Sequence, residues 1–243
     1  MGETPPRFLL TICLSVSLAL AVCLGVPEVW AEPSDIDDAE VTRRLEYLEN
    51  SLEKGKVYAN IWWWGWTVGQ LGAAVIFGTL AYTDRDTPGS TANNSVSAVQ
   101  SLLGGALLMI DPLDAAFVPR KIRGMPAGTP DERRAKLAAA EKGLKDAAKW
   151  EKLGRHWINH IMGFALGAVG FALLTDAFSD TDWKDGLFNF ALSFGVTEIM
   201  IWTQPTRAMR DLEAYEREFL GEERGPEVSF GAWPGGGAVT VSF

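Results

Sequence analysis

The two histidines of this 243-residue chain, His156 and His160, are four residues apart, a spacing that places both side chains on one face of a helix. Such a pair can bind one divalent metal ion, and Glu198 or Asp111 could supply a carboxylate ligand. A haem with histidine ligation is a further alternative. The interpretation we favour is simpler: histidines at a membrane interface face headgroups or carbonyl groups without binding a metal.

Several polar residues interrupt apolar sequence, where each must find a hydrogen-bond partner. Glu198 is the strongest case, because Val196, Ile199 and Ile201 surround it. We expect it to pair with His160 or Arg207, or to hold a proton. The predicted buried polar residues are Asp111, Asn159, Glu198 and Gln204.

The elements that must position these residues are four apolar segments. Each is about long enough to cross a bilayer as a helix, which needs roughly 20 residues. The fold class predicted is therefore an all-α membrane protein with four transmembrane helices arranged as two similar hairpins, residues 61–118 and 157–205. A very apolar soluble bundle is the alternative, but little sequence remains to cover such helices. The segments are residues 61–82, 96–118, 157–178 and 187–204.

Glycines at helix-packing spacing recur in the first and third segments. Small residues three or four apart let helix backbones approach closely in a membrane. We therefore expect these two segments to pack on each other, within one chain or between subunits. The glycines are Gly65, Gly69 and Gly72 in the first segment, and Gly163, Gly167 and Gly170 in the third.

Three amphipathic helices are predicted on one side of the membrane, at residues 32–60, 119–156 and 206–225. Thr129 and Glu132 form a helix-start pattern before the second of them. Residues 32–60 have a net charge of −4, residues 119–156 of +6 and residues 205–243 of −3. We expect the basic helix to pack between the two acidic ones as a cap, against the alternative of three separately solvated helices.

Six tryptophans fall near the cap-side ends of the apolar segments. Tryptophan is enriched where a membrane meets water, so we interpret them as an interface belt. A pocket for a quinone, pigment or sterol is the minor alternative. The residues are Trp62, Trp63, Trp64, Trp66, Trp157 and Trp202.

Residues 1–31 have the pattern of a signal peptide: Arg7, an apolar run and a small-x-small site that ends at Ala31. An uncleaved anchor helix and a lipoprotein processed at Cys23 are the weaker alternatives. Cleavage would remove both cysteines, which excludes a disulfide, a thiolate nucleophile and an iron–sulfur cluster from the mature chain.

The last residues, 226–243, predict a β-hairpin around a Pro-Gly turn. Val239, Val241 and Phe243 share one face of its second strand, and this ending resembles the C-terminal signal of bacterial outer-membrane β-barrels. Cleavage of the leader would place the cap and both termini outside the cytoplasm, although basic loops normally stay inside. We favour the inner membrane slightly over the outer membrane.

The net charge of −9 argues against a nucleic-acid partner. No motif names a reaction, so we expect a non-enzymatic scaffold or accessory subunit of a bacterial envelope complex, embedded in the bilayer and oligomeric. A metal or redox protein built on His156, His160 and Glu198 is one alternative. A small-solute or lipid conduit between the two hairpins is the other.

Overall fold

The computed structural model describes residues 36–177, 182–221, 227–233 and 236–242, and its regular elements are helices except for two C-terminal strands. The predicted signal peptide therefore lies outside the described residues. The helices are α2 (Asp38–Thr83), α3 (Pro88–Ile110), α4 (Asp114–Arg123), α5 (Pro130–Gly154), α6 (Trp157–Ala172), the π-helical turn η1 (Leu173–Ala177), α7 (Trp183–Trp202), α8 (Arg207–Tyr215) and the π-helical turn η2 (Glu216–Leu220).

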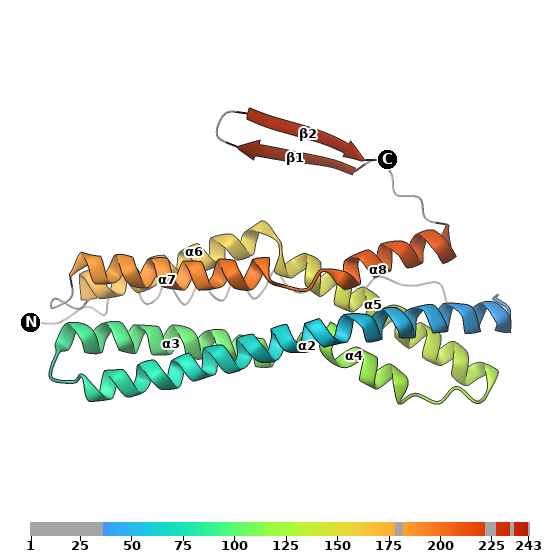
Figure 1. The fold of residues 1–243 in the computed structure, drawn as a ribbon, viewed down its shortest axis with the longest axis horizontal. Coiled ribbons are helices and arrows are strands. Elements are labelled where there is room, and N and C mark those ends of the chain that lie inside the picture. Colours follow the sequence, from blue (N-terminus) through green and yellow to red (C-terminus); the bar gives the residue numbers. More distant parts are fainter. Residues whose placement is uncertain (1–35, 178–181, 222–226, 234–235, 243) are drawn as a thin grey trace, which may run out of the picture. The chain divides into compact units, whose positions relative to one another are not determined.

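Helix α2 runs without a break through two regions that the sequence suggested were separate (Figure 1). The Asp37 side chain caps its start by accepting a hydrogen bond from the Glu40 N–H at 2.7 Å. No proline, the residue that most strongly breaks a helix, occurs between Asp38 and Thr83. The helix is therefore not interrupted at the predicted boundary between residues 60 and 61. The boundary marks only a change in the kind of residues that one helix exposes.

The first region is a helical cap, which we define as residues 38–60 of α2 with α4, α5, α8 and η2. The predicted apolar stripe of α2 lies in its core, as do Leu137 and Leu144 of α5 and Tyr215 of α8. The predicted capping box also forms, because Thr129 and Glu132 each bond the other's backbone N–H. The predicted packing of amphipathic helices is present in the structure. The buried residues of the α2 stripe are Val41, Leu45, Leu48 and Leu52.

Opposite charges meet across the cap, as the charge pattern predicts. Asp38 of α2 lies 3.2 Å from both Arg133 and Arg134 of α5. Glu49 of α2 contacts Lys136 of α5 at 2.5 Å. Exposed pairs contribute only about 0.2–1 kcal/mol each, so they align helices that the apolar core holds together.

The second region is the apolar half, which we define as residues 61–83 of α2 with α3, α6 and α7. Three of the described helices are long and apolar enough to span a membrane, and these comprise α3 with α4, α6, and α7 with α8. The part of α2 at residues 61–82 is outside this set, because Gln70 and the tryptophans lower its mean hydropathy. Asp111-Pro112 separates α3 from α4, so the second predicted segment is not one helix.

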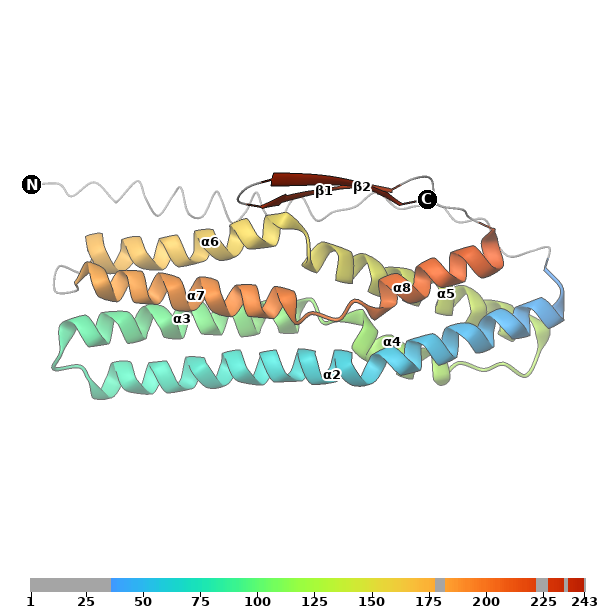
Figure 2. The same ribbon diagram turned by 45° about the horizontal axis from the view of Figure 1, so that its top comes forward.

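The apolar half consists of two helix pairs, α2 with α3 and α6 with α7 (Figure 2). In the first pair, Gly105 of α3 lies against Leu71 of α2, where an added Cβ would be 2.7 Å from the leucine side chain. In the second, Gly163 of α6 lies against Thr197 of α7, and the corresponding distance is 2.6 Å. A glycine therefore permits close packing in both pairs. The second helix, α3, supplies it in one pair, and the first helix, α6, supplies it in the other.

The predicted contact between the two glycine faces is wrong within the chain. The glycines of α6 face α7 and α3, whereas an added Cβ at Gly65, Gly69 or Gly72 of α2 would meet no atom within 4 Å. The short Leu-Gly-Ala match between the segments therefore predicts no common packing. Among the residues that the structure describes, nothing covers this face of α2.

A row of amides and hydroxyls joins the two helix pairs. Asn189 of α7 donates to Ser97 of α3 at 3.0 Å and to Asn93 at 3.3 Å. One turn further along, Ser193 of α7 donates to Gln100 of α3 at 2.8 Å. We call these five residues the polar ladder. In lipid such interhelical bonds supply attraction that burial of apolar surface cannot supply.

The chain ends in two strands, β1 (Glu227–Trp233) and β2 (Gly236–Ser242), which pair antiparallel with Val228 opposite Val241. Val239 is opposite Phe230 in this register. Phe243 is outside the described residues, and the predicted assembly role of this tail stays a prediction.

Candidate functional site

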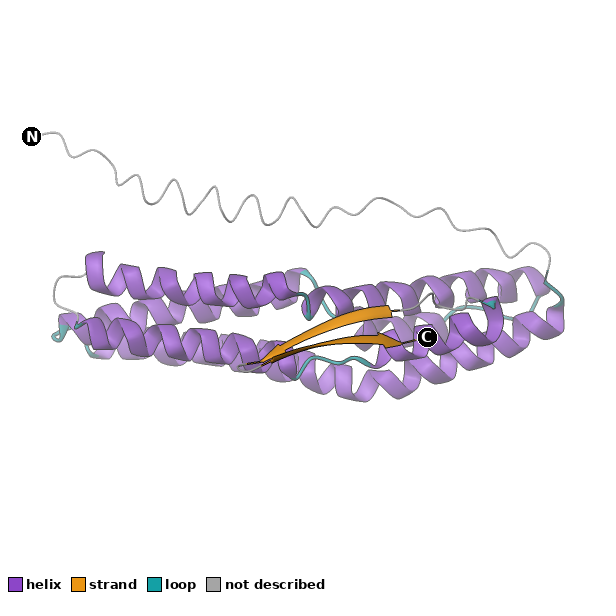
Figure 3. Cartoon of the chain, turned by 90° about the horizontal axis from the view of Figure 1, so that it is seen from above, coloured by secondary structure: helices purple, strands orange, loops and turns teal. Residues whose placement is uncertain are grey.

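Two helix breaks lie side by side where the cap meets the apolar half. One separates α5 from α6 and the other separates α7 from α8, whereas α2 continues past both (Figure 2). Figure 3 draws the connections between helices as teal loops. Gln204, in the second break, is buried and donates to the Glu151 carbonyl at 3.3 Å. Gly154 lies directly against the Gln204 amide, with no room for a Cβ. These contacts hold the two breaks against each other, so that side chains from both form one site.

The structure brings together two of the three proposed metal ligands. His160 Nδ1 lies 2.8 and 2.9 Å from the two carboxylate oxygens of Glu198, and Trp202 donates its indole N–H to the same carboxylate at 3.1 Å. Glu198 therefore has two partners within its own helix pair. Arg207, the other candidate partner, instead pairs with Asp211 at 3.1 Å.

His156 does not join this pair. It precedes α6 as the N-cap, and its Nδ1 accepts a bond from the Ile158 N–H at 3.4 Å. The i, i+4 spacing places two residues on one helix face only when both are helical, and His156 has extended backbone angles. Within the described residues no group of three or more His, Cys, Asp and Glu side chains could hold a metal ion.

The other predicted buried polar residues have different surroundings. Asn159 closes the break before α6 by donating to the carbonyls of Leu153 and Gly154 at 2.6 and 3.0 Å. Asp111 is exposed in the single chain at the C-terminal end of α3, and its burial in a membrane stays a prediction. It follows the last turn of the helix instead of lying within it, because Pro112 prevents continuation.

The six tryptophans also differ in how exposed they are. Trp64, Trp157 and Trp202 are exposed, as an interface belt requires. Trp62 and Trp63, in contrast, are buried in the cap core, and the Trp63 indole donates to the Leu108 carbonyl at 2.9 Å. These two indoles therefore pack against α5 and α3 instead of facing outward, and the interface belt itself stays a prediction. Trp66 is half-buried and donates to Thr203 at 3.3 Å.

A pocket of about 350 Å³ opens beside the two breaks, and we call it the junction pocket. Four of its lining residues are basic and none is acidic. The Arg155 guanidinium lies 5.4 Å from the centre of the Trp202 ring, so the pocket adjoins the Glu198 carboxylate through Trp202. Its lining residues are Lys54, Gly55, Tyr58, Arg155, Trp202, Gln204, Pro205, Thr206, Arg207 and Arg210.

Sequence reasoning missed Glu151, which is almost fully buried in the cap. One of its carboxylate oxygens accepts from the Met209 N–H at 3.0 Å, so this α5 residue caps the start of α8, whose own Thr206 makes no side-chain cap. Burial raises its pKa, and backbone bonds from Met209 and Ala208 oppose that shift. In the sequence Glu151 is seven residues after Leu144, which places it on the same face of the predicted helix.

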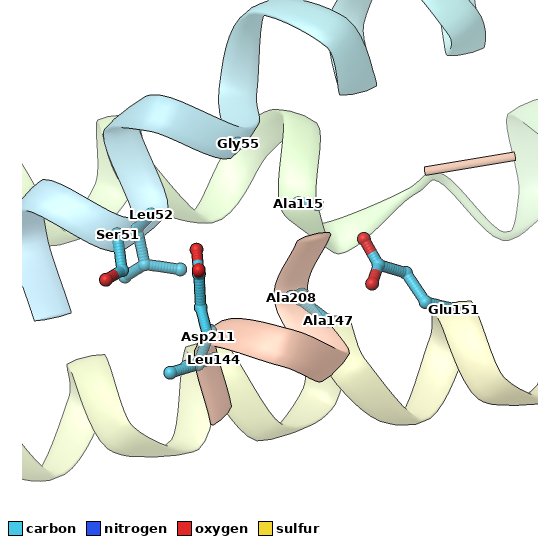
Figure 4. Close-up of a pocket in the computed structure, with 9 residues that line it drawn as sticks. All are labelled: Ser51, Leu52, Gly55, Ala115, Leu144, Ala147, Glu151, Ala208 and Asp211. Atoms are coloured by element: carbon cyan, nitrogen blue, oxygen red, sulfur yellow. The ribbon is translucent and has the colours of Figure 1, made fainter. Parts of the chain in front are cut away.

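Glu151 also lines a small cavity between α2, α4, α5 and α8 (Figure 4). The cavity volume is about 10 Å³, near the minimum for one water molecule. The second Glu151 oxygen, Oε1, has no hydrogen-bond partner among the described residues. The cavity is too small for a substrate, so Glu151 has a structural role here.

No protein-family model matches the chain, and no curated protein or solved structure is significantly similar to it.

Proposed function

We propose that this protein is a non-enzymatic membrane scaffold or accessory subunit of a bacterial cell-envelope complex. One observation supports the proposal most strongly: the core of buried apolar side chains lies mainly in the cap, whereas many large apolar side chains are exposed along the apolar half. Ile110 of α3 is 78% exposed and Phe188 of α7 is 64% exposed, whereas Leu48 of the cap is fully buried. Such a surface requires lipid or another protein to cover it.

A fourth crossing is part of the proposal. Residues 61–82 of α2 pack along α3, whose length and apolarity suit a membrane span. A helix that returns beside α3 through the same depth would cross the same bilayer. Val68, Val75 and Ile76 are exposed on this part of α2, which is the surface that lipid contact requires.

An oligomer is also part of the proposal. The open glycine face of α2, at Gly65, Gly69 and Gly72, has no neighbour within 4 Å of an added Cβ among the described residues. In membranes such faces favour close helix contact. We infer that a second copy or an envelope partner covers this face.

The alternatives have less support. In the described residues Glu198 bonds to His160 and Trp202, which suits a structural pair as well as a metal ligand set. The polar ladder bonds α3 to α7 directly, which favours a closed contact over a conduit between the helix pairs. The cap and both termini on the non-cytoplasmic side, and the inner membrane as the location, remain part of the proposal.

The test is the state of the full-length protein in native membranes. Membranes would be washed with alkaline carbonate, then extracted with a polymer that retains lipid, and the particle mass would be measured. We expect the protein to resist the wash and to leave the membrane as an oligomer or with a stoichiometric partner. Release by carbonate would contradict the membrane location, and a bare monomer would contradict the scaffold.

Gly69→Leu sharpens this test. An added Cβ at Gly69 would meet no described atom within 4 Å, so we expect the monomer to fold normally. If the α2 face is the contact, the variant particle should lose mass while it stays in the membrane. An unchanged particle mass would remove the α2 glycine face as the contact.

A further inference from the structure

We propose that the junction pocket binds the phosphate group of an anionic phospholipid. This inference rests on the proposed membrane location of the apolar half. Lipid headgroups and free phosphate share the same recognition chemistry, and the position of the pocket favours the lipid.

The charge of the pocket supports an anion. Lys54 from α2, Arg155 from the break before α6, and Arg207 and Arg210 from α8 all line it. Arg207 shares its charge with Asp211. The other three have no carboxylate within ion-pair distance in the described part of the chain, although Glu151 is buried near Arg210. Three lining cations that make no salt bridge among the described residues favour a phosphate, which accepts several charge-assisted hydrogen bonds.

The depth of the pocket suits a headgroup. Trp202 ends α7 and Tyr58 lies in α2 just before the apolar half, and both side chains line the pocket. Tryptophan and tyrosine occur at the headgroup level of membranes, and basic pockets between membrane helices bind anionic headgroups. Ile199, one turn before Trp202, is exposed, so acyl chains could follow the α7 surface into the bilayer.

The walls of the pocket are held in place before any ligand binds. The Tyr58 hydroxyl donates to the Thr203 carbonyl at 2.7 Å, which ties α2 to the break after α7. Arg155 lies over the Trp202 ring, and the buried Gln204 amide bonds to α5. A preformed site loses less conformational entropy on binding.

The chain offers a matched set of variants. Lys54→Gln with Arg210→Gln removes two exposed cations from the pocket, and neither makes an ion pair among the described residues. Lys149→Gln with Lys152→Gln removes two exposed cations from α5 that do not line the pocket. Both double variants change the net charge equally, so a general effect of charge would lower lipid retention equally in both.

The experiment measures lipid retention by the full-length protein in detergent, using native mass spectrometry. Dioleoyl phosphatidylglycerol is the anionic probe, dioleoyl phosphatidylcholine the neutral one and inorganic phosphate the free anion. We expect one phosphatidylglycerol to be retained, with affinity about tenfold lower in the pocket variant and unchanged in the α5 variant. Equal loss in both variants, or none in the pocket variant, would overturn the proposal.

Two further outcomes identify the ligand source. Phosphate binding as tight as phosphatidylglycerol binding would overturn the lipid assignment, as would equal retention of phosphatidylcholine.

The carbonate wash of the pocket variant separates this inference from the proposed function. A variant that stays in the membrane with wild-type lipid retention contradicts only the pocket, whereas wild-type protein released by carbonate contradicts the membrane location.

Discussion

The cap and the apolar half are both built from helices, but different forces hold them. In the cap, large side chains such as Leu48, Leu137 and Leu144 are almost completely buried. In the apolar half, close contacts form at Gly105 and Gly163, and large side chains point outward. Water drives apolar side chains into a core, whereas lipid gives no such drive and leaves packing to small residues and hydrogen bonds.

Helix α2 shows both arrangements in one element. Its first part buries a single apolar stripe against α5 and α8, and its second part packs one side on α3 and exposes apolar residues elsewhere. The change occurs around Trp62 and Trp63, the last large apolar residues of α2 that are buried. The surface that the helix exposes therefore becomes more apolar along its length, while the backbone continues unbroken.

The largest effect should come from removing a cap side chain. Leu48→Ala deletes buried apolar volume and leaves a cavity, so we expect a loss of about 2–5 kcal/mol in unfolding free energy. Leu107→Ala in α3 truncates an exposed side chain and should change stability in detergent by less than about 0.5 kcal/mol. Chemical denaturation of both variants in the same detergent checks the difference, and equal losses would contradict the comparison.

The next effect separates the two glycine faces. Gly163→Ala places a Cβ 2.6 Å from the Thr197 side chain, and we expect a loss of about 1–3 kcal/mol. Gly69→Ala meets no atom and favours the helix, so it should be neutral or stabilising by up to about 1 kcal/mol.

Thermal melts in detergent, at a dilution where the chain is monomeric, measure both glycine variants. A melting temperature lowered equally by the two substitutions would mean that the α2 face is covered within the chain.

A smaller effect is expected from the polar ladder. Asn189→Ala removes the bonds to Asn93 and Ser97, and interhelical bonds of this kind contribute about 0.6 kcal/mol on average in membranes. Thr79→Ala is the control, because its hydroxyl bonds only to the Val75 carbonyl of its own helix among the described contacts. A double-mutant cycle of Asn189→Ala with Ser97→Ala should show coupling, and additive effects would remove the ladder as a link.

The smallest effect concerns Glu151 and depends on pH. Its pKa in the folded chain is raised above the ordinary value of 4.5, mainly by burial. An acid with a raised pKa stabilises the fold below the unfolded value, and this contribution is lost as the pH rises through the folded pKa. Glu151→Gln cannot ionise, so its stability relative to wild type should increase with pH above about 4.5.

Melts of the Glu151→Gln variant and wild type across this pH range provide the measurement. Because Gln can still accept the Met209 N–H, the cap of α8 should persist at every pH. A constant difference between the two proteins would show that Glu151 does not titrate with folding.

Local patterns predicted much of this fold. The α2 stripe and the Thr129–Glu132 capping box depend on residues a few positions apart, so periodicity and spacing suffice. The same local reasoning joined His160 to Glu198 only as one of several options. It could not find the Glu151 contact with α8, which joins residues 58 positions apart.

Other differences between prediction and structure have the same cause. Trp62 and Trp63 are buried because α5 and α3 pack against them. The face at Gly69 is open because no described helix packs there. Residue type cannot distinguish a tryptophan that faces lipid from one that faces a neighbouring helix. Non-local packing therefore decides the parts of the site that sequence left open.

The central claim is that one end of this molecule lies in lipid and the other in water. Its direct test is spin labelling of single cysteines in a Cys13→Ser, Cys23→Ser background, in lipid bilayers. The label would replace exposed residues Val75, Leu103 and Phe188 in the apolar half, and Glu46 and Lys142 in the cap. We predict that the first three contact oxygen and exclude a polar nickel complex, and that the last two contact the nickel complex. Equal nickel accessibility at all five positions would contradict the account.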